Sequence, residues 1–337
     1  MYFGKEIVTG MSVVVKKLNE DDQEDLLREL QITLRLEILR NDSQEQSVIQ
    51  QMISKLDYRD GLPQILGIKL AQTKGEIMMA NAGNTLSRWS HDIGSDLETR
   101  FEFAFEMCKQ LINALKRLHT VGYSHCDLKY ENICASVNKA GKLIFTLIDF
   151  GVSSKLKLGS KCRNIKVFRG NFNYSTFEHI ANGRANQVDD VTSLLYIAFK
   201  FVYRKLPWED FKDNKSSPNE VAYAVMRYTN RHQFRQDLIN SETPFAEAFT
   251  YLQAQNIKVK KLRHQQSQST SFNLDYAAIQ NLIPPTSDRN WNQYWSTELV
   301  TFDDCVTEYR NIGGSLLHQQ NPVDTRDELL DFYHHVA

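Results

Sequence analysis

The amino-terminal part of the chain carries a hydrophobic pattern that predicts a β-hairpin and then helix. Ile7-Val8 and Val13–Val15 are two β-prone runs, and Thr9-Gly10 can form the turn between them because glycine readily takes a positive φ. A long, highly charged stretch from Glu20 to about Leu56 follows and is broken at residues 41–43. Its second part repeats apolar residues at the spacing of a helix face, at Val48, Ile49, Met52, Ile53 and Leu56.

The middle of the chain predicts strands on either side of a long helix. Ile77–Met79 is a short β-prone run, and residues 143–148 form another. Between them, Ser95 and Glu98 have the spacing of a capping box at the start of a helix. That helix has one apolar stripe, which we expect to be buried, at Phe101, Phe105, Cys108, Ile112 and Leu115.

The carboxyl-terminal half predicts mainly helix. Leu194–Val202 is the most apolar stretch, but it is short and interrupted by a lysine, so we expect a buried helix and no membrane span. Residues 228–295 include a basic and polar tract, from Lys258 to Ser271, that is typical of an exposed insertion. Residues 302–312 and 325–336 predict two closing helices.

The composition limits the class of protein. A chain of 337 residues can form one large or two medium folding units. Its net charge of -1 gives no global attraction to nucleic acid or membranes, so we expect no nucleic-acid partner. The cysteines are odd in number and form no C-x-x-C pair, and Met1–Glu6 has no apolar core of a signal peptide. We therefore expect an intracellular, cytoplasmic protein with reduced thiols, and leave a cytoskeletal location open.

Two polar motifs follow predicted elements. The run His125–Asn132 reads H-C-D-L-K-Y-E-N and comes after the long helix, and Asp149-Phe150-Gly151 comes after the strand at residues 143–148. Asp127 can orient a hydroxyl group there. The side chains of Asn132 and Asp149 offer the oxygen ligands that Mg²⁺ prefers.

These motifs resemble the H-R-D-L-x-x-x-N loop and the D-F-G triplet of protein kinases. The D-x-K-x-x-N spacing that starts at Asp127 is similar to that of Ser/Thr kinases, and Leu206-Pro207-Trp208 is similar to a motif of the casein kinase 1 group (casein kinase 1, tau-tubulin and vaccinia-related kinases). The resemblance covers about residues 2–215. It implies an α+β, bilobal fold, with a small antiparallel β-sheet lobe at residues 1–80 and a larger, mainly helical lobe at residues 81–337.

The resemblance also implies an activity. It is that of a Ser/Thr protein kinase, which transfers the γ-phosphate of ATP to a protein hydroxyl with Mg²⁺ as its metal. Asp127 and Lys129 would be catalytic, with Asp127 orienting the hydroxyl and Lys129 neutralising the phosphate. Asn132 and Asp149 would bind the metal.

The small lobe would bind the nucleotide. The run V-V-V-K that ends at Lys16 resembles the V-A-I-K strand of kinases, so Lys16 is our candidate for binding the phosphates. The strand that ends with Met79 leads into a predicted hinge at residues 80–83, and we expect Met79, Asn81 and Ala82 beside the adenine.

Three glutamates are candidates for the partner of that lysine, because kinases pair it with a glutamate on the next helix. They are Glu29, Glu37 and Glu45. We choose Glu45, because it heads the apolar stripe and Ser43 offers an N-cap. This choice makes residues 20–42 an insertion.

The segment after the D-F-G triplet also resembles that of kinases. Residues 170–178 are similar to the end of a kinase activation segment, with Glu178 as its structural acid and Phe177 in place of a proline. Residues 188–195 look like the start of the central helix of the large lobe. The resemblance implies that Asp190 hydrogen-bonds the backbone of the 125–132 loop.

Two features depart from the kinase pattern. A G-x-G-x-x-G loop should precede the lysine strand, but only Gly4 and Gly10 do so, at the wrong spacing. The pattern thus starts at the strand after that loop, and we expect slow turnover unless another segment covers the phosphates. Cys126 replaces the arginine that pairs with a phosphorylated activation segment, so we expect no control by such phosphorylation. A packed thiol is more ordinary there than a reactive one.

The charge of the activation segment indicates a substrate class. Between Asp149 and Glu178 there is no acidic residue, but basic residues recur, at Lys155, Lys157, Lys161, Arg163, Lys166 and Arg169. A cationic segment attracts acidic or already phosphorylated peptides, which casein kinase 1 relatives favour. A solvated basic loop without a role in recognition stays as the alternative.

Two other functions compete with an active protein kinase. The first is a pseudokinase or weakly active module that serves as a structural subunit of a larger assembly, which the lack of a glycine loop and the predicted insertions favour. The retention of all four polar groups of the two motifs favours catalysis instead. The second is a small-molecule kinase of the choline or aminoglycoside type, against which Lys129, the complete D-F-G triplet and Leu206-Pro207-Trp208 argue.

Overall fold

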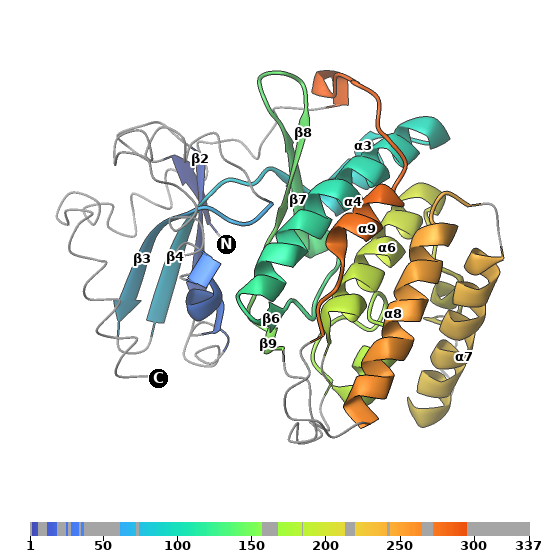
Figure 1. The fold of residues 1–337 in the computed structure, drawn as a ribbon. Helices are drawn as coiled ribbons and strands as arrows, with labels where there is room; N and C mark the ends of the chain where they lie inside the picture. The colour runs from blue at the N-terminus through green and yellow to red at the C-terminus, as the bar shows by residue number, and fades with distance from the viewer. Residues whose placement is uncertain are drawn as a thin grey trace.

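The computed structural model of the chain shows a small β-sheet lobe beside a larger helical lobe (Figure 1). It describes the following residues: 2–5, 12–18, 25, 28–33, 35–36, 61–71, 74–156, 168–183, 185–212, 220–240, 243–264 and 272–294. The predicted closing helices at residues 302–312 and 325–336 lie outside these ranges. In the part of the chain that is described, no helix is long and apolar enough to cross a membrane.

The small lobe is an antiparallel sheet with the strand order β1-β2-β4-β3. Its strands are β1 (Tyr2–Lys5), β2 (Ser12–Leu18), β3 (Ile65–Ala71) and β4 (Lys74–Ala80). The three consecutive valines of β2 are buried, and β-branched side chains favour such a strand. The predicted hairpin is present between β1 and β2, but its first strand is Tyr2–Lys5, and Ile7-Val8 with the turn lies outside the described residues.

A short helix at residues 28–33 joins the two lobes (Figure 1). Leu30 packs with Ile77 and Met79 of β4, whereas Ile32 and Leu36 belong to the hydrophobic core of the large lobe. Because neighbouring helical residues point in different directions, one short helix can bury side chains against both lobes.

Two long helices form the centre of the large lobe. They are α4 (Leu97–Thr120) and α6 (Gln187–Tyr203). Helix α4 begins at Asp96, whose carboxylate accepts a hydrogen bond from the Thr99 amide at 3.0 Å, so the cap lies one residue after the predicted Ser95. Asn186 and Asp189 form a capping box at the start of α6. The apolar run in α6 is almost entirely buried, as predicted.

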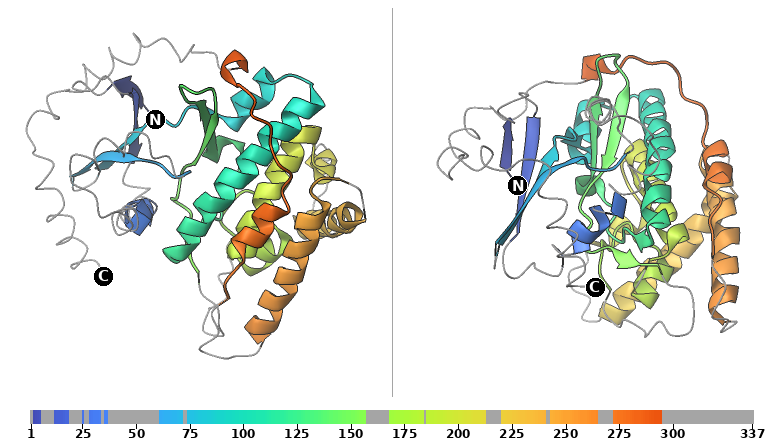
Figure 2. Two further views of the ribbon diagram at one scale, coloured as in Figure 1. Left: turned by 45° about the horizontal axis from the view of Figure 1, so that its top comes forward. Right: turned by 60° about the vertical axis from the view of Figure 1, so that its left-hand side comes forward.

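The remaining helices cover this centre (Figure 2). They are α3 (Leu86–Asp92), α5 (Phe177–Asn182), α7 (Glu220–Ile239), α8 (Ala246–His264) and α9 (Tyr276–Asn281), with short 3₁₀ turns η3 (Pro207–Lys212) and η4 (Asn292–Tyr294). In the tract that was predicted to be exposed, the lysines at 258, 260 and 261 are exposed on α8. The opposite face of this helix packs in the main core through Phe249, Leu252 and Val259. Residues 265–271 of that tract lie outside the described residues.

Short strands position the two motifs. A three-stranded sheet has the order β5-β7-β8, with β5 (Asn84–Thr85), β7 (Ile133–Val137) and β8 (Leu143–Leu147), and β6 (Tyr123–Ser124) pairs with β9 (Ser154–Lys155). The 125–132 loop therefore runs from β6 to β7 and ends in the 3₁₀ turn η2 (Tyr130–Asn132). Asp149 follows β8 by two residues, so both motifs lie at the same end of the β7–β8 hairpin.

Candidate active site

Lys16 of β2 contacts two carboxylates. Its Nζ lies 2.5 Å from Oε2 of Glu29 and 2.8 Å from Oδ1 of Asp149. Burial acts to lower the pKa of Lys16, but the two negative charges outweigh it and raise that pKa above its ordinary value. Burial likewise acts to raise the pKa of Asp149, but the ammonium group of Lys16 lowers it. The three side chains form a charged cluster between the lobes.

Among the described residues, Glu29 is therefore the helix glutamate that pairs with Lys16, a different candidate from the Glu45 that we chose from the sequence. Glu45 lies outside the described residues, and the carboxylate beside Lys16 comes from the helix at residues 28–33. Leu30 fixes that helix against β4, which brings the preceding glutamate under the strand. The prediction that residues 20–42 are an insertion depended on choosing Glu45, so it loses its basis.

The 125–132 loop gathers the polar groups of the first motif. Asp127 is 8% exposed, and its Oδ2 lies 2.6 Å from Nζ of Lys129. The Asn132 amide nitrogen donates to the same Oδ2 at 3.0 Å and to the Asp127 carbonyl at 2.8 Å. Oδ2 of Asp127 thus accepts from both Lys129 and Asn132. The hydrogen bond from Asn132 to the Asp127 carbonyl also connects the end of the loop to its middle.

Ile148 connects this loop to Asp149. Its N–H donates to the Asn132 carbonyl at 2.9 Å, and its carbonyl accepts from Nε2 of His125 at 3.1 Å. Phe150 is 1% exposed and its ring lies edge-on to His125, with 5.5 Å between the ring centroids. Asp149 itself has a φ of 68°, which turns its side chain back toward the loop and Lys16. Both predicted motifs therefore converge on one place.

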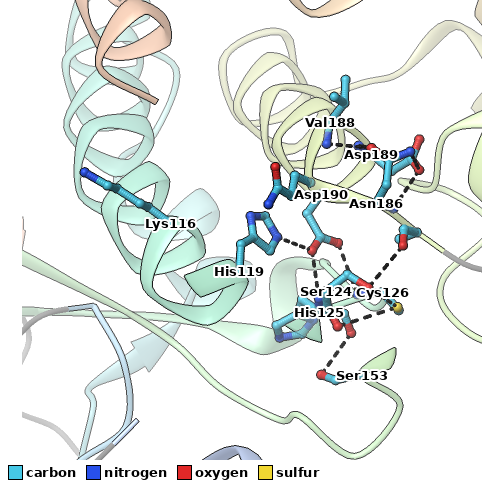
Figure 3. Close-up of polar contacts among 12 residues, drawn as sticks. Lys116, His119, Ser124, His125, Cys126, Ser153, Asn186, Val188, Asp189 and Asp190 are labelled. Carbon is cyan, nitrogen blue, oxygen red and sulfur yellow. Dashed lines mark hydrogen bonds and ion pairs between the residues drawn. The ribbon is translucent and has the colours of Figure 1, made fainter. Parts of the chain in front are cut away.

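Asp190 of α6 holds the start of the loop (Figure 3). Its Oδ2 accepts from the His125 amide at 2.7 Å and its Oδ1 from the Cys126 amide at 3.1 Å, as the sequence predicted. Cys126 has a φ of 71°, a conformation that costs an L-residue free energy unless its surroundings impose it. The buried carboxylate therefore stabilises a strained turn one residue before Asp127.

The thiol of Cys126 is packed. Its Sγ lies 3.3 Å from the Ser124 hydroxyl and 3.2 Å from the Ser154 hydroxyl. Burial raises the pKa of Cys126 to about 11, so the thiol is protonated at neutral pH. The environment favours the packed thiol over the reactive one.

Comparison with known proteins decides the family. The sequence-family model of the protein kinase domain matches residues 1–263 of this chain. The chain belongs to the protein kinase family. The two-lobed α+β fold is the one that the resemblance implied. The matched residues include the D-F-G triplet, the 125–132 loop and the pair of Lys16 with Glu29.

Three relatives illustrate how far the similarity extends. A probable serine/threonine-protein kinase of Dictyostelium discoideum is 32% identical over 108 residues, which are 31% of this chain and 22% of that protein. A casein kinase 1-like protein of Oryza sativa subsp. japonica is 32% identical over 118 residues, 32% of this chain and 16% of that protein. Nucleosomal histone kinase 1 of Drosophila melanogaster is 28% identical over 154 residues, 44% of this chain and 25% of that protein. This chain therefore matches a quarter or less of the length of each.

Protein kinases use ATP and a divalent metal, and the donors at this site fit a hard cation. Asp149 engages Lys16 through Oδ1, and Asn132 engages Asp127 through its amide nitrogen. Oδ2 of Asp149 and Oδ1 of Asn132 have no hydrogen-bond partner among the described residues. A carboxylate and an amide oxygen are the donors that Mg²⁺ prefers.

The hinge lies between β4 and β5. Met79 is 7% exposed and packs with Leu30 of the helix at residues 28–33. Asn81 and Ala82 are half-buried, and the Asn81 carboxamide accepts from the Gly83 amide at 2.9 Å. Gly83 has a φ of 96°, and a Cβ there would lie 2.2 Å from the Ala135 carbonyl oxygen, so the close contact of hinge and β7 requires glycine.

The described end of the activation segment, residues 168–178, packs against the 125–132 loop and α7. Arg231 of α7 is 1% exposed and donates to the carbonyls of Phe172 and Ser175. Trp208 donates from its indole nitrogen to the Asn173 carbonyl at 2.7 Å. The carbonyls of three neighbouring residues are thereby fixed. Residues 157–167, which carry most of the basic side chains of this segment, lie outside the described ranges.

Glu178 is buried at the end of this segment. Its carboxylate lies 2.9 Å from Nζ of Lys260 and 3.5 Å from Nη2 of Arg235. Burial acts to raise the pKa of Glu178, but these two cations lower it below its ordinary value. Glu178 therefore ties the activation segment to α7 and α8, which agrees with its predicted structural role.

Two groups of contacts were not found from the sequence. Arg231 and Trp208 hold the activation segment, a role that the motif Leu206-Pro207-Trp208 does not indicate by itself. His119 and Tyr276 extend the hydrogen bonds of Asp190 away from the loop. No local pattern indicates these contacts, because their partners are far apart along the chain.

Proposed function

We propose that this chain is a Ser/Thr protein kinase of the casein kinase 1 type, which transfers the γ-phosphate of ATP to serine or threonine of a protein. The observation that carries the proposal is the cluster of Lys16 with Glu29 and Asp149. Phosphoryl transfer by a protein kinase needs a lysine that pairs with the helix glutamate. It also needs the D-F-G aspartate beside that lysine.

Each side chain has a distinct task in this proposal. Lys16 binds the nucleotide phosphates, and Met79, Asn81 and Ala82 border the adenine. Asn132 and Asp149 hold Mg²⁺, which supplies positive charge to the transferred phosphoryl group. Asp127 accepts the hydrogen bond of the substrate hydroxyl and orients it.

Lys129 supports that orientation. Its ammonium group lies 2.6 Å from Oδ2 of Asp127 and adds positive charge where the phosphoryl group passes. Asn132 restricts the carboxylate from the other side, at 3.0 Å. The aspartate therefore presents its second oxygen, Oδ1, to the incoming hydroxyl.

The substrate class in this proposal is an acidic or already phosphorylated peptide. Lys155 and Arg169 are exposed at the two described ends of the activation segment, which is otherwise basic in sequence. Positive charge near the phosphate acceptor raises the local concentration of anionic peptides. Relatives that are named as casein kinase 1-like support the choice of group.

Phosphate transfer tests the proposal. The purified chain is given radiolabelled ATP and Mg²⁺ with four peptides, which carry an acidic serine site, a phosphorylated serine site, a neutral serine site or a tyrosine site. We expect labelling of the first two, loss of all labelling with Asp127→Asn, and a larger loss on acidic than on neutral peptides with Lys161→Gln/Arg163→Gln. Equal loss on both kinds of peptide would contradict the substrate class.

The outcome also separates the enzyme from a kinase-fold scaffold. Labelling of serine peptides that disappears with Asp127→Asn supports the enzyme. Nucleotide binding with no transfer to any peptide, unchanged by Asp127→Asn, would contradict the proposal and favour a structural role in a larger assembly.

A further inference from the structure

Tyr276 lies far along the chain from the 125–132 loop, yet a buried path of hydrogen bonds connects them. It is the first residue of α9, which packs against α4 (Figure 1). Tyr276 is 5% exposed, and its hydroxyl contacts Nδ1 of His119 near the end of α4. His119 is 4% exposed.

The other side of the His119 ring contacts Asp190. Nε2 lies 2.8 Å from Oδ2 of the carboxylate. Figure 3 marks this contact with a dashed line. Burial acts to raise the pKa of Asp190, but the hydrogen bond from His119 lowers it below its ordinary value, so the group is ionised. An ionised carboxylate can only accept, so Nε2 must carry a proton.

The proton on Nε2 assigns a role to the tyrosine. When the imidazole ring is neutral, a proton on Nε2 leaves Nδ1 without one, and Nδ1 then accepts from the Tyr276 hydroxyl. Burial and the nearby Asp190 raise the pKa of Tyr276, so its hydroxyl keeps the proton that it donates. Tyr276 thus favours the tautomer of His119 that donates to Asp190.

We propose that Tyr276 is a positioning residue for Asp127, acting through His119 and Asp190. Asp190 holds the amides of His125 and Cys126, and Cys126 has a positive φ directly before Asp127. The Asp127 amide in turn donates to Nδ1 of His125 at 3.2 Å. A change in the tilt of the Asp190 carboxylate therefore reaches the backbone of Asp127.

The test compares two variants of α9. Tyr276→Phe removes one hydroxyl and leaves the ring. Ile279→Val removes a methyl group from a side chain that is 0% exposed in the same helix and has no polar atom that could join the hydrogen-bonded path. A tyrosine that only anchored α9 would behave like Ile279, because both changes weaken the packing of the same helix.

Three readouts are measured on the full chain. The ¹⁵N chemical shifts of the His119 ring report its tautomer, hydrogen exchange reports the amides of His125 and Cys126, and steady-state kinetics separate kcat from KM for ATP. The kinetic readout rests on the proposed function, whereas the two spectroscopic readouts do not. If the wild-type chain fails to transfer phosphate, the proposed function fails and the positioning role is still decided by spectroscopy.

We expect Tyr276→Phe to give mixed His119 tautomers and about tenfold faster exchange of the two amides, which corresponds to losing one partner of a buried hydrogen bond. In an active enzyme kcat falls by a similar factor while KM for ATP is unchanged. Ile279→Val should keep the single tautomer and the slow exchange. An unchanged tautomer and unchanged exchange in Tyr276→Phe, or the same changes in both variants, would overturn the proposal.

Discussion

Lys16 and Glu29 form an ion pair between β2 and the helix that follows it, with 2.5 Å between Nζ and Oε2. Both side chains are largely buried, at 14% and 5% exposure. A buried charge is costly unless an opposite charge lies beside it. Here a second carboxylate, that of Asp149, contacts the same ammonium group. The pair therefore couples the position of the helix to the site between the lobes.

Removing the charge of Glu29 tests this coupling. We expect Glu29→Gln to lower the rate of phosphate transfer by on the order of 10²-fold, because Lys16 loses the group that fixes its position. The free energy of unfolding should fall by about 1–3 kcal/mol, the usual cost of leaving a buried partner unsatisfied. Kinetics and urea denaturation measure the two effects.

Glu45→Gln and Glu37→Gln are the matched controls, since both glutamates were candidates for the same role in the sequence. Both variants should keep wild-type rates. A loss of rate in Glu45→Gln as large as that in Glu29→Gln would show that the assignment of Glu29 is wrong.

Arg231 offers a test of substrate binding. It fixes the carbonyls of Phe172 and Ser175, so Arg231→Lys should loosen the activation segment while keeping the charge. We expect KM for the peptide to rise about 5–10-fold, as for the loss of one buried hydrogen bond, with KM for ATP unchanged. The control is Gln233→Ala, an exposed position of the same helix. Equal changes of both KM values would contradict a role confined to the peptide.

His179 predicts a pH dependence of stability. Burial lowers the pKa of His179 to about 4. The unfolded chain binds a proton on this ring below about pH 6.5, whereas the folded chain binds it only near pH 4. The contribution of the neutral ring to the free energy of unfolding is therefore fully present above about pH 6.5 and is lost as the pH falls toward 4. This single group should lower the free energy of unfolding by about 2 kcal/mol between pH 7 and pH 5.

Urea denaturation at both pH values measures that difference. His179→Gln should reduce it by this amount, whatever its effect on stability at pH 7. His91→Gln is the control, because the His91 side chain is 85% exposed and should leave the difference unchanged. The same difference in wild type and His179→Gln would contradict the burial of a neutral ring.

Cys126 should resist modification. With a pKa of about 11, only about one thiol in a thousand is ionised at pH 8, and the thiolate is the reactive form. We expect iodoacetamide to leave Cys126 unmodified in the folded chain and to alkylate it in urea, as measured by mass spectrometry. Cys126→Ser should retain transfer activity. Rapid alkylation of the folded chain would instead support a reactive thiol.

Patterns that act over a few residues were sufficient to predict much of the fold. The stripe of α4 and the apolar run of α6 are buried because helical periodicity places such residues on one face. The two motifs predicted Asp127, Asn132 and Asp149 as one site, and the hydrogen bonds of Ile148 bring the motifs together.

Contacts between distant residues could not be predicted in the same way. The three glutamates after β2 all lie in charged helical sequence, and what selects Glu29 is the packing of Leu30 on β4. The tract at Lys258 is polar in sequence but contributes Lys260 to Glu178, because one face of α8 is buried. Tyr276 and His119 meet only once α9 has packed on α4.

The Mg²⁺-dependent affinity for ATP tests the central claim most directly. Titration calorimetry compares the wild-type chain with Asp149→Asn and Asp127→Asn, in the presence and absence of Mg²⁺. If Asp149 holds the metal and Asp127 orients the hydroxyl, Asp149→Asn should weaken the binding of ATP by about tenfold or more. This loss corresponds to one charged metal ligand, so it should appear only in the presence of Mg²⁺. Asp127→Asn should bind ATP like the wild type. Wild-type affinity and Mg²⁺ dependence in Asp149→Asn would contradict the account.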